Sequence, residues 1–324
     1  MVQSADAEFL VGDDIEGLEA QGRDERRERL LDTEILARVT PQQKLTLIHL
    51  LQDAGEVVAM TGDGVNDAPA LQNADIGVAM GQRGTEVARE ASDMILLDDA
   101  FPTIVEAVER GRAIIENIRK FVVYLISGNI GEIALVGTAA VLGVTLPLLP
   151  LQILYLNVLN DVFPALALGV GPASAFVMDR PPTSGDTTVL DAEDWWEVVG
   201  FGLLIAVAVG TAFWVALGPM GWTTERAVTV SFLAVSTTRL LHVFNMRDPS
   251  SGPFDNEVTR NGYVWGALAL DLLLLLAAVH VPVLSGVLSL TPPGTDGWLL
   301  VGASALAPLI VGQFYLRVRR LADE

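Results

Sequence analysis

Six long apolar stretches fill most of the chain after residue 120 and constrain its fold more than any other feature. They lie near residues 121–144, 151–170, 198–217, 227–244, 264–283 and 298–316. Each has about 18 to 24 residues, enough at about 1.5 Å per helical residue to cross a hydrocarbon core of about 30 Å. In lipid, a helix satisfies the backbone polar groups within one such segment. The sequence therefore predicts an all-α bundle of six membrane-spanning helices within residues 121–324.

Arginines in the loops between these stretches predict how the bundle is oriented. One side holds Arg180, Arg247, Arg260, Arg317, Arg319 and Arg320, whereas Arg226 falls on the other. Loops rich in positive charge face the cytoplasm, and the polar residues 1–120 precede the first stretch on that same side. We therefore expect an integral protein of a prokaryotic plasma membrane, in contact with lipid and with both termini in the cytoplasm.

Charge and cysteine content exclude several kinds of partner and site. The formal net charge is −20, and Lys44 and Lys120 are the only lysines. Nucleic acid is excluded as a partner, because a phosphate backbone requires a basic surface. The chain has no cysteine, so disulfides and thiolate metal sites are excluded as well. This acidic, lysine-poor composition fits both a halophilic organism and a GC-rich genome, and the sequence favours neither.

Residues 1–100 have the pattern of an α/β domain. Four short apolar runs predict strands, at 35–39, 56–60, 76–80 and 93–97. Helical segments lie between them, as in βα units built on a parallel sheet. Thr40 is placed to cap the helix after the first run, with Pro41 at the first helical position and Gln43 completing a capping box. Residues 101–120 are predicted to form an amphipathic helix that leads toward the membrane.

The run MTGDGVNDAPAL, residues 60–71, follows the second predicted strand. A loop at the carboxyl end of a parallel strand is where α/β folds bind phosphate ligands and metals. Gly62 and Gly64 allow a sharp turn and a close approach to a ligand. Asp63 and Asp67 carry the oxygen ligands that Mg²⁺ prefers. An acidic surface turn would explain two or three of these residues, but the whole string favours a site.

This string resembles the hinge motif of the P-type ATPases, cation pumps that form an aspartyl phosphate. Further similarity lies in TPQQK (40–44), ADIGVAM (74–80), DDAFPTIVEAVERGRAI (98–114), NIRKFVVYLISGNIGE (117–132), LNVLNDVFPALALGV (156–170) and MDRPP (178–182). The chain is most similar to the type II, calcium-pump-like branch. The resemblance implies that residues 1–100 are the carboxy-terminal half of a HAD-like, Rossmann-type phosphorylation domain. Residues 101–120 would be a stalk helix, and residues 121–324 the transmembrane domain.

The resemblance also implies roles for residues of the soluble part. Lys44 would reach the phosphorylated aspartate and neutralise phosphoryl charge, although a lysine there can also be a solvated surface residue. Asp63 would hold Mg²⁺, and Asn66 would hydrogen-bond the phosphate that ATP supplies. Asp67 would hold the residues that contact the ligand without contacting the ligand itself, and Thr61 and Gly62 would line the same loop.

Two motifs of complete pumps do not occur in the sequence: DKTGT, with the phosphorylated aspartate, and TGES of the actuator domain. We therefore expect the chain to work with an amino-terminal half that supplies the actuator, the nucleotide-binding domain through which ATP acts, and the first four spans. Alone, it is predicted to be inactive, and whether to class it as an enzyme stays open. The alternatives are a non-enzymatic remnant membrane protein and a pump for a monovalent cation, Na⁺ or H⁺.

Polar side chains within the first two spans predict a cation site. Asn129 and Glu132 share one helix face, and Asn157, Asn160 and Asp161 share another. An ionisable residue inside a span is costly and indicates function, and these are hard oxygen ligands. Polar contacts between helices are the alternative explanation.

Helix-breaking residues strengthen the prediction of a cation site in these spans. Pro164 has no N–H for the carbonyl of Asn160, which is thereby free to bind a ligand. Gly128 and Gly131 are expected to allow close helix approach.

The resemblance implies that Asn129, Glu132, Asn157, Asn160 and Asp161 are ligands of the transported ion, which would be Ca²⁺. Arg239 then stands where a related pump has a glutamate ligand. Pointing inward, it would pair with Glu132 or Asp161 and limit the site to one divalent ion. Alternatively, it would snorkel to the cytoplasmic interface. Asp271, in the fifth span, receives no role.

Overall fold

The computed structural model describes residues 9–11, 15, 17–18, 22–33, 35–179 and 188–323, apart from seven side chains at Phe9, Arg23, Asp24, Arg26, Asn160, Ala322 and Asp323. The chain divides into two compact units, one formed largely by residues up to Val108 and the other largely by residues from Glu109 onward. The motif MDRPP extends into residues 180–182, which lie outside the described part.

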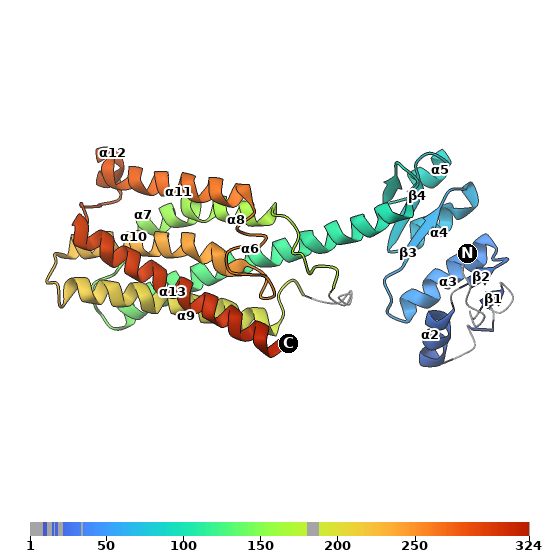
Figure 1. Cartoon of the computed structure of the whole chain (residues 1–324), viewed down its shortest axis with the longest axis horizontal. Helices are drawn as coiled ribbons and strands as arrows, with labels where there is room; N and C mark the ends of the chain where they lie inside the picture. Colours follow the sequence, from blue (N-terminus) through green and yellow to red (C-terminus); the bar gives the residue numbers. More distant parts are fainter. Residues whose placement is uncertain are drawn as a thin grey trace. The chain divides into compact units, whose positions relative to one another are not determined.

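Short parallel strands form the centre of the first unit (Figure 1). Strands β1 (Phe9–Val11) and β2 (Ile35–Ala37) pair with each other. Strands β3 (Ala59–Gly62), β4 (Ile76–Met80) and β5 (Met94–Leu96) form a second sheet in that order. The helices are α2 (Arg23–Asp32), α3 (Pro41–Asp53), α4 (Ala68–Asn73) and α5 (Glu86–Glu90), with a 3₁₀ turn, η1 (Val65–Asp67), after β3. The α/β class and the parallel pairing are as predicted.

Three details of this unit differ from the sequence prediction, and the first is that strand β1 is not among the predicted strands. The described strands form two sheets rather than one, and β3 begins at Ala59 rather than at Glu56. Val58 donates its N–H to the side chain of Asp75 at 2.9 Å instead of to a strand, and Val57 is exposed. The first residues of the apolar run that predicted this strand therefore lie in the segment before β3, and Val57 among them is exposed.

The start of α3 forms as its sequence predicts. Thr40 is the N-cap and accepts the backbone N–H of Gln43 at 3.3 Å, while its own N–H donates to the Gln43 side chain at 2.9 Å. Pro41 occupies the first helical position, where a missing N–H costs nothing. This cap fixes the turn that carries Lys44.

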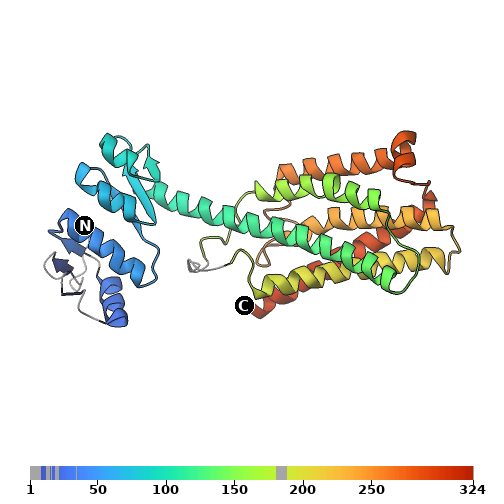
Figure 2. The same cartoon turned by 180° about the vertical axis from the view of Figure 1, so that it is seen from behind.

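The second unit contains the membrane helices (Figure 2). Six helices in the described part are long and apolar enough to cross a membrane, as the sequence predicts. They are α6 (Phe101–Val141), α7 (Pro150–Tyr155) continued through η2 (Leu156–Asn160) into α8 (Val162–Gly169), α9 (Ala192–Leu217), α10 (Thr224–His242) with η3 (Val243–Met246), α11 (Gly262–His280) and α13 (Gly294–Asp323). A short helix, α12 (Pro282–Val287), follows α11. The expected stalk helix and first span are one continuous helix, α6.

Helix α10 is the most enclosed of the six. An 18-residue apolar segment of this span is 83% buried inside the protein, whereas the corresponding segments of the other five spans are 28–41% buried. It packs mainly against α13 and α9, and its Val230, Phe232 and Leu233 lie in the main apolar core. Polar side chains on α10 therefore face protein on nearly every side.

Candidate cation site and magnesium loop

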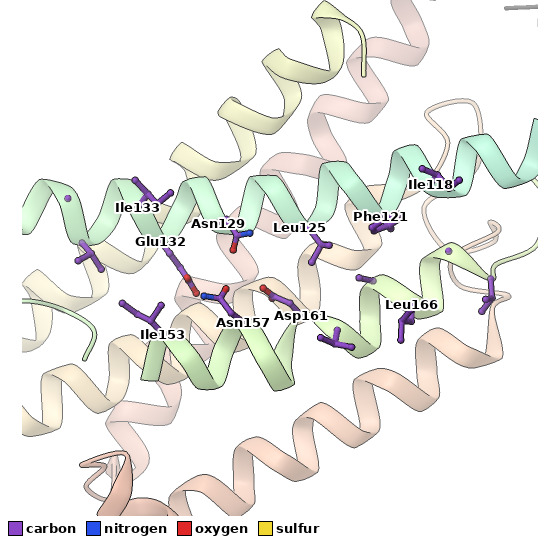
Figure 3. Close-up of a pocket in the computed structure, with 16 residues that line it drawn as sticks. Ile118, Phe121, Leu125, Asn129, Glu132, Ile133, Ile153, Asn157, Asp161 and Leu166 are labelled. Atoms are coloured by element: carbon purple, nitrogen blue, oxygen red, sulfur yellow. The ribbon is translucent and has the colours of Figure 1, made fainter. Parts of the chain in front are cut away.

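A groove with a volume of about 990 Å³ runs between α6 and the second span. Figure 3 shows Asn129 and Glu132 on α6 facing Asn157 and Asp161 on the other side. Apolar side chains such as Leu125 and Ile153 line the rest of the groove. The structure thus brings together four of the five residues that the sequence predicts as cation ligands. The side chain of the fifth, Asn160, lies outside the described part.

The second span is distorted where these residues occur. Residues Leu156–Asn160 form a π-helical turn, and the N–H of Asp161 bonds the carbonyl of Leu156 at 3.1 Å, five residues back. Turns of this kind are frequent at functional sites. The turn lies four residues before Pro164, which has no N–H to continue the regular ladder. The proline predicted a break in the helix, and the break takes this form.

Arg239 lies across the two carboxylates of the groove. Its Nη1 is 2.7 Å from Glu132 Oε1, and its Nη2 is 2.9 Å from Asp161 Oδ2. Nη2 also donates to Asn129 Oδ1 at 3.0 Å. The side chain is 1% exposed. The inward orientation, with both predicted partners, is what the structure shows; snorkelling to the interface is wrong because α10 is enclosed by protein at this point.

The carboxylates keep acceptor capacity beyond Arg239. Asp161 Oδ1 is buried and has no hydrogen-bond partner among the described residues, and the Asn157 side chain hydrogen-bonds Glu132. The described residues contain no group of three or more acidic or histidine side chains placed to hold a metal. A cation in the groove would therefore be bound by two carboxylates together with amide oxygens, a donor set that suits a hard cation.

Two further buried polar groups were given no role by the sequence analysis. Asp271 on α11 is 2% exposed, and neither of its carboxylate oxygens has a hydrogen-bond partner among the described residues. Its charge interacts with that of Asp161. The Tyr124 hydroxyl on α6 is likewise buried without a partner in that part of the chain. In the sequence, each of these residues is visible only as a polar side chain within an apolar segment. That pattern does not show which other residues the side chain contacts.

The loop after β3 is held by Asp67. Its Oδ1 is 2.6 Å from Lys44 Nζ, and its Oδ2 accepts the N–H groups of Gly64 and Asp63 at 3.2 and 3.4 Å. Burial raises the pKa of Asp67, but the Lys44 ammonium and the Gly64 N–H outweigh burial and hold the pKa below its usual value. A Cβ on Gly62 would lie 2.6 Å from Asp67 Cβ, so only glycine fits there.

Asp63 is free to face a ligand while its backbone is fixed. Its side chain is exposed, and its carbonyl accepts the Thr85 N–H at 2.8 Å. Asn66 is exposed within η1, and Thr61 precedes the loop in β3. An exposed carboxylate on a fixed loop at a strand's carboxyl end fits Mg²⁺. Lys44 lies beside this loop, in an ion pair with Asp67.

Comparison with known proteins assigns the family. A model described as "Cation transporting ATPase, C-terminus" matches residues 145–318, more than half of the chain. The chain belongs to the P-type cation-transporting ATPases. A second model, "haloacid dehalogenase-like hydrolase", matches residues 11–75, in agreement with the fold of the first unit.

Relatives of this chain come from distant organisms. A "Calcium-transporting ATPase" of Bacillus subtilis is 41% identical over 281 residues, which are 86% of this chain and 32% of the relative. A "Calcium-transporting ATPase" of Plasmodium falciparum is 33% identical over 335 residues, covering 90% of this chain and 27% of the relative. "Calcium-transporting ATPase 4, endoplasmic reticulum-type" of Arabidopsis thaliana is 48% identical over 179 residues, 55% and 17% respectively. The chain spans about a third of the length of the first of these relatives.

Proposed function

We propose that this chain is the ion pathway and magnesium loop of an ATP-driven pump for Ca²⁺. The observation that carries the proposal is the meeting of Glu132, Asp161, Asn129 and Asn157 in one groove at the centre of two spans. Such carboxylates mark ion pathways in membrane proteins. The names of the relatives, calcium-transporting ATPases, support the choice of ion.

Charge supports a single divalent ion. Glu132, Asp161 and Asp271 are three buried carboxylates, and Arg239 supplies one positive charge. When all four are ionised, the group carries two negative charges, which one Ca²⁺ neutralises. A second Ca²⁺ would leave an excess of two positive charges within the hydrocarbon depth, at high cost.

In the soluble unit, Asp63 would hold Mg²⁺ and Asn66 would hydrogen-bond the phosphoryl oxygens. Bound Mg²⁺ would neutralise charge on the transferring phosphoryl group. Lys44 and Asp67 keep the loop in place through their ion pair. The phosphorylated aspartate and the nucleotide site would come from an amino-terminal half, so the 324-residue chain alone is expected to form no acyl phosphate from ATP.

Equilibrium binding of ⁴⁵Ca²⁺ to the chain in lipid nanodiscs tests the proposal. We expect one ion per chain, lost in Glu132→Gln and in Asp161→Asn, and kept in the control Asp296→Asn, an exposed carboxylate at the start of α13. Competition by millimolar Na⁺ would favour the monovalent pump instead. A folded chain that binds neither ion would favour a non-transporting remnant.

A further inference from the structure

The loop between α10 and α11, residues 247–261, carries an exposed aromatic side chain at its tip. Phe254 is 92% exposed, more than any other large apolar side chain in the described part of the chain. Pro253 beside it is also exposed. An exposed apolar residue is expected on a span, where lipid covers the helix, but Phe254 lies outside every span in that part. What it contacts therefore depends on where the loop is placed.

Hydrogen bonds within the loop hold its tip in one conformation. Asn256 Oδ1 accepts the N–H groups of Val258 at 3.0 Å and Thr259 at 2.9 Å. Arg260 pairs with both carboxylate oxygens of Asp255, at 2.6 and 2.7 Å. Asp255 directly follows the aromatic residue, so this ion pair neutralises the only charge at the tip. An ordered apolar tip without net charge can enter a membrane surface, because unpaired charge is what makes entry costly.

Contacts of the loop with α6 indicate its depth. Glu257, three residues after Phe254, lies 2.7 Å from Lys120 Nζ. Lys120 directly precedes the apolar stretch 121–144 and lies twelve residues before Glu132, in the middle of that stretch. At about 1.5 Å per helical residue, twelve residues span about 18 Å, slightly more than half of a hydrocarbon core of about 30 Å. With Glu132 near the middle of the membrane, the loop lies at the depth of the lipid headgroups.

Exposed aromatic residues occur at the same end of the bundle. Tyr263 and Trp265 are exposed in the first turn of α11, and the Trp265 indole N–H donates to the Thr259 carbonyl of the loop at 2.8 Å. Trp195 and Trp196 are exposed near the start of α9, which an ion pair ties to the same part of α6 as the loop. Aromatic rings are enriched at membrane–water interfaces. The tip of the loop continues this band of aromatic side chains.

We propose that Phe254 inserts into the headgroup region of the adjoining lipid leaflet and fastens the loop to the membrane surface. The partner is the lipid bilayer, because the tip is apolar, lies at headgroup depth and continues the aromatic band of α9 and α11. The loop also holds α6 through the ion pair between Glu257 and Lys120. Membrane contact at Phe254 thus steadies α6 where this helix leaves its apolar stretch. This role of Phe254 is independent of which ion the groove binds.

Fluorescence quenching in lipid nanodiscs tests the insertion, and the absence of cysteine from the sequence allows a single dye label. A bimane dye on Pro253→Cys leaves Phe254 in place. Controls carry the dye on Leu273→Cys, exposed on the span α11, and on Glu90→Cys, exposed in the first unit. We expect a nitroxide on the lipid acyl chain to quench the dye at position 253 at least half as strongly as at position 273. Aqueous iodide should quench it at least threefold less than at position 90.

Two results of this experiment overturn the proposal. Iodide quenching at position 253 equal to that at position 90 would place the tip in water. Shielding of position 253 from both quenchers would mean that protein, such as a second copy of the chain, covers the tip instead of lipid.

A second comparison asks whether the aromatic ring itself makes the contact. In the labelled Pro253→Cys chain, Phe254→Asp should reduce quenching by the lipid nitroxide at least threefold, whereas Phe254→Trp should retain it. Because the side chain is 92% exposed, neither change disturbs packing within the protein, and the circular dichroism spectra should match. Hydrogen–deuterium exchange in residues 114–120 of α6 should rise with Phe254→Asp alone. Equal lipid quenching or equal exchange in the two variants contradicts the proposed anchoring.

Discussion

Asp63 is the residue on which the proposed chemistry of the soluble unit depends. Its exposed carboxylate stands on a loop fixed by Asp67 and Thr85. In a chimera that joins this chain to the amino-terminal two thirds of the Bacillus subtilis relative, Asp63→Ala should reduce ATP turnover by at least about 100-fold, because Mg²⁺ loses a ligand at the transferring phosphoryl group. Binding of ⁴⁵Ca²⁺ should persist. Near-normal turnover, matching the exposed control Glu90→Ala, would show that Asp63 is not the metal ligand.

The ion pair between Lys44 and Asp67 makes the stability of the loop after β3 depend on pH, with a sign that follows from the pKa shift of Asp67. The pKa of Asp67 is lowered in the folded chain. The ionised carboxylate therefore stabilises the folded loop above the ordinary pKa of 3.8, and this stabilisation is lost as pH falls through the lower pKa of the folded state. Lys44 is partly exposed, which limits the pair to at most about 1 kcal/mol. Lys44→Met should therefore speed amide exchange in α4 at pH 7, and the difference should shrink near pH 3. An equal difference at both pH values would contradict the assignment.

At the scale of elements, α6 and α9 approach each other through glycine. A Cβ on Gly202 would lie 2.7 Å from Ile130 Cγ2 and 2.9 Å from the Ser127 carbonyl, whereas one on Gly200 meets nothing within 4 Å. Gly202→Leu should thus lower the melting temperature of the chain in detergent by several degrees, since overpacking costs about 1–3 kcal/mol. Gly200→Leu is the matched control. Equal melting temperatures for both variants would show that α6 and α9 can move apart without a loss of folding stability.

Elements that depend on local chemistry were predictable from the sequence, and those that depend on distant partners were not. The cap at Thr40 and the six apolar spans follow from neighbouring residues. The partner of Gly128 did not follow, because the sequence predicted contact with a helix and the structure places a guanidinium there. Gly131 does meet a helix, with the Gly202 carbonyl 3.1 Å from its Cβ position. Both glycines carry the same local signal, and only the tertiary arrangement distinguishes them.

At the scale of the whole molecule, the proposed binding of a single divalent ion depends on the charge of Arg239. The guanidinium already neutralises part of the charge of Glu132 and Asp161. At about 4 Å and an effective dielectric near 20, two unit charges interact by roughly 4 kcal/mol, so a divalent ion would meet roughly twice that repulsion from Arg239. Under the proposed function, this repulsion would keep a second ion out of the group.

Reversing that charge should change the stoichiometry. In the chimera with the Bacillus subtilis relative, Arg239→Glu removes the repulsion and adds a carboxylate at an enclosed position of α10. We expect equilibrium ⁴⁵Ca²⁺ binding to rise from one ion per chimera to two, with a steeper dependence of turnover on Ca²⁺. Loss of all binding would instead mean that Arg239 is needed to hold Glu132 and Asp161 in place. Two ions bound by the unchanged chimera would refute the proposal that the charge of Arg239 excludes a second ion, because the guanidinium would then leave room for both.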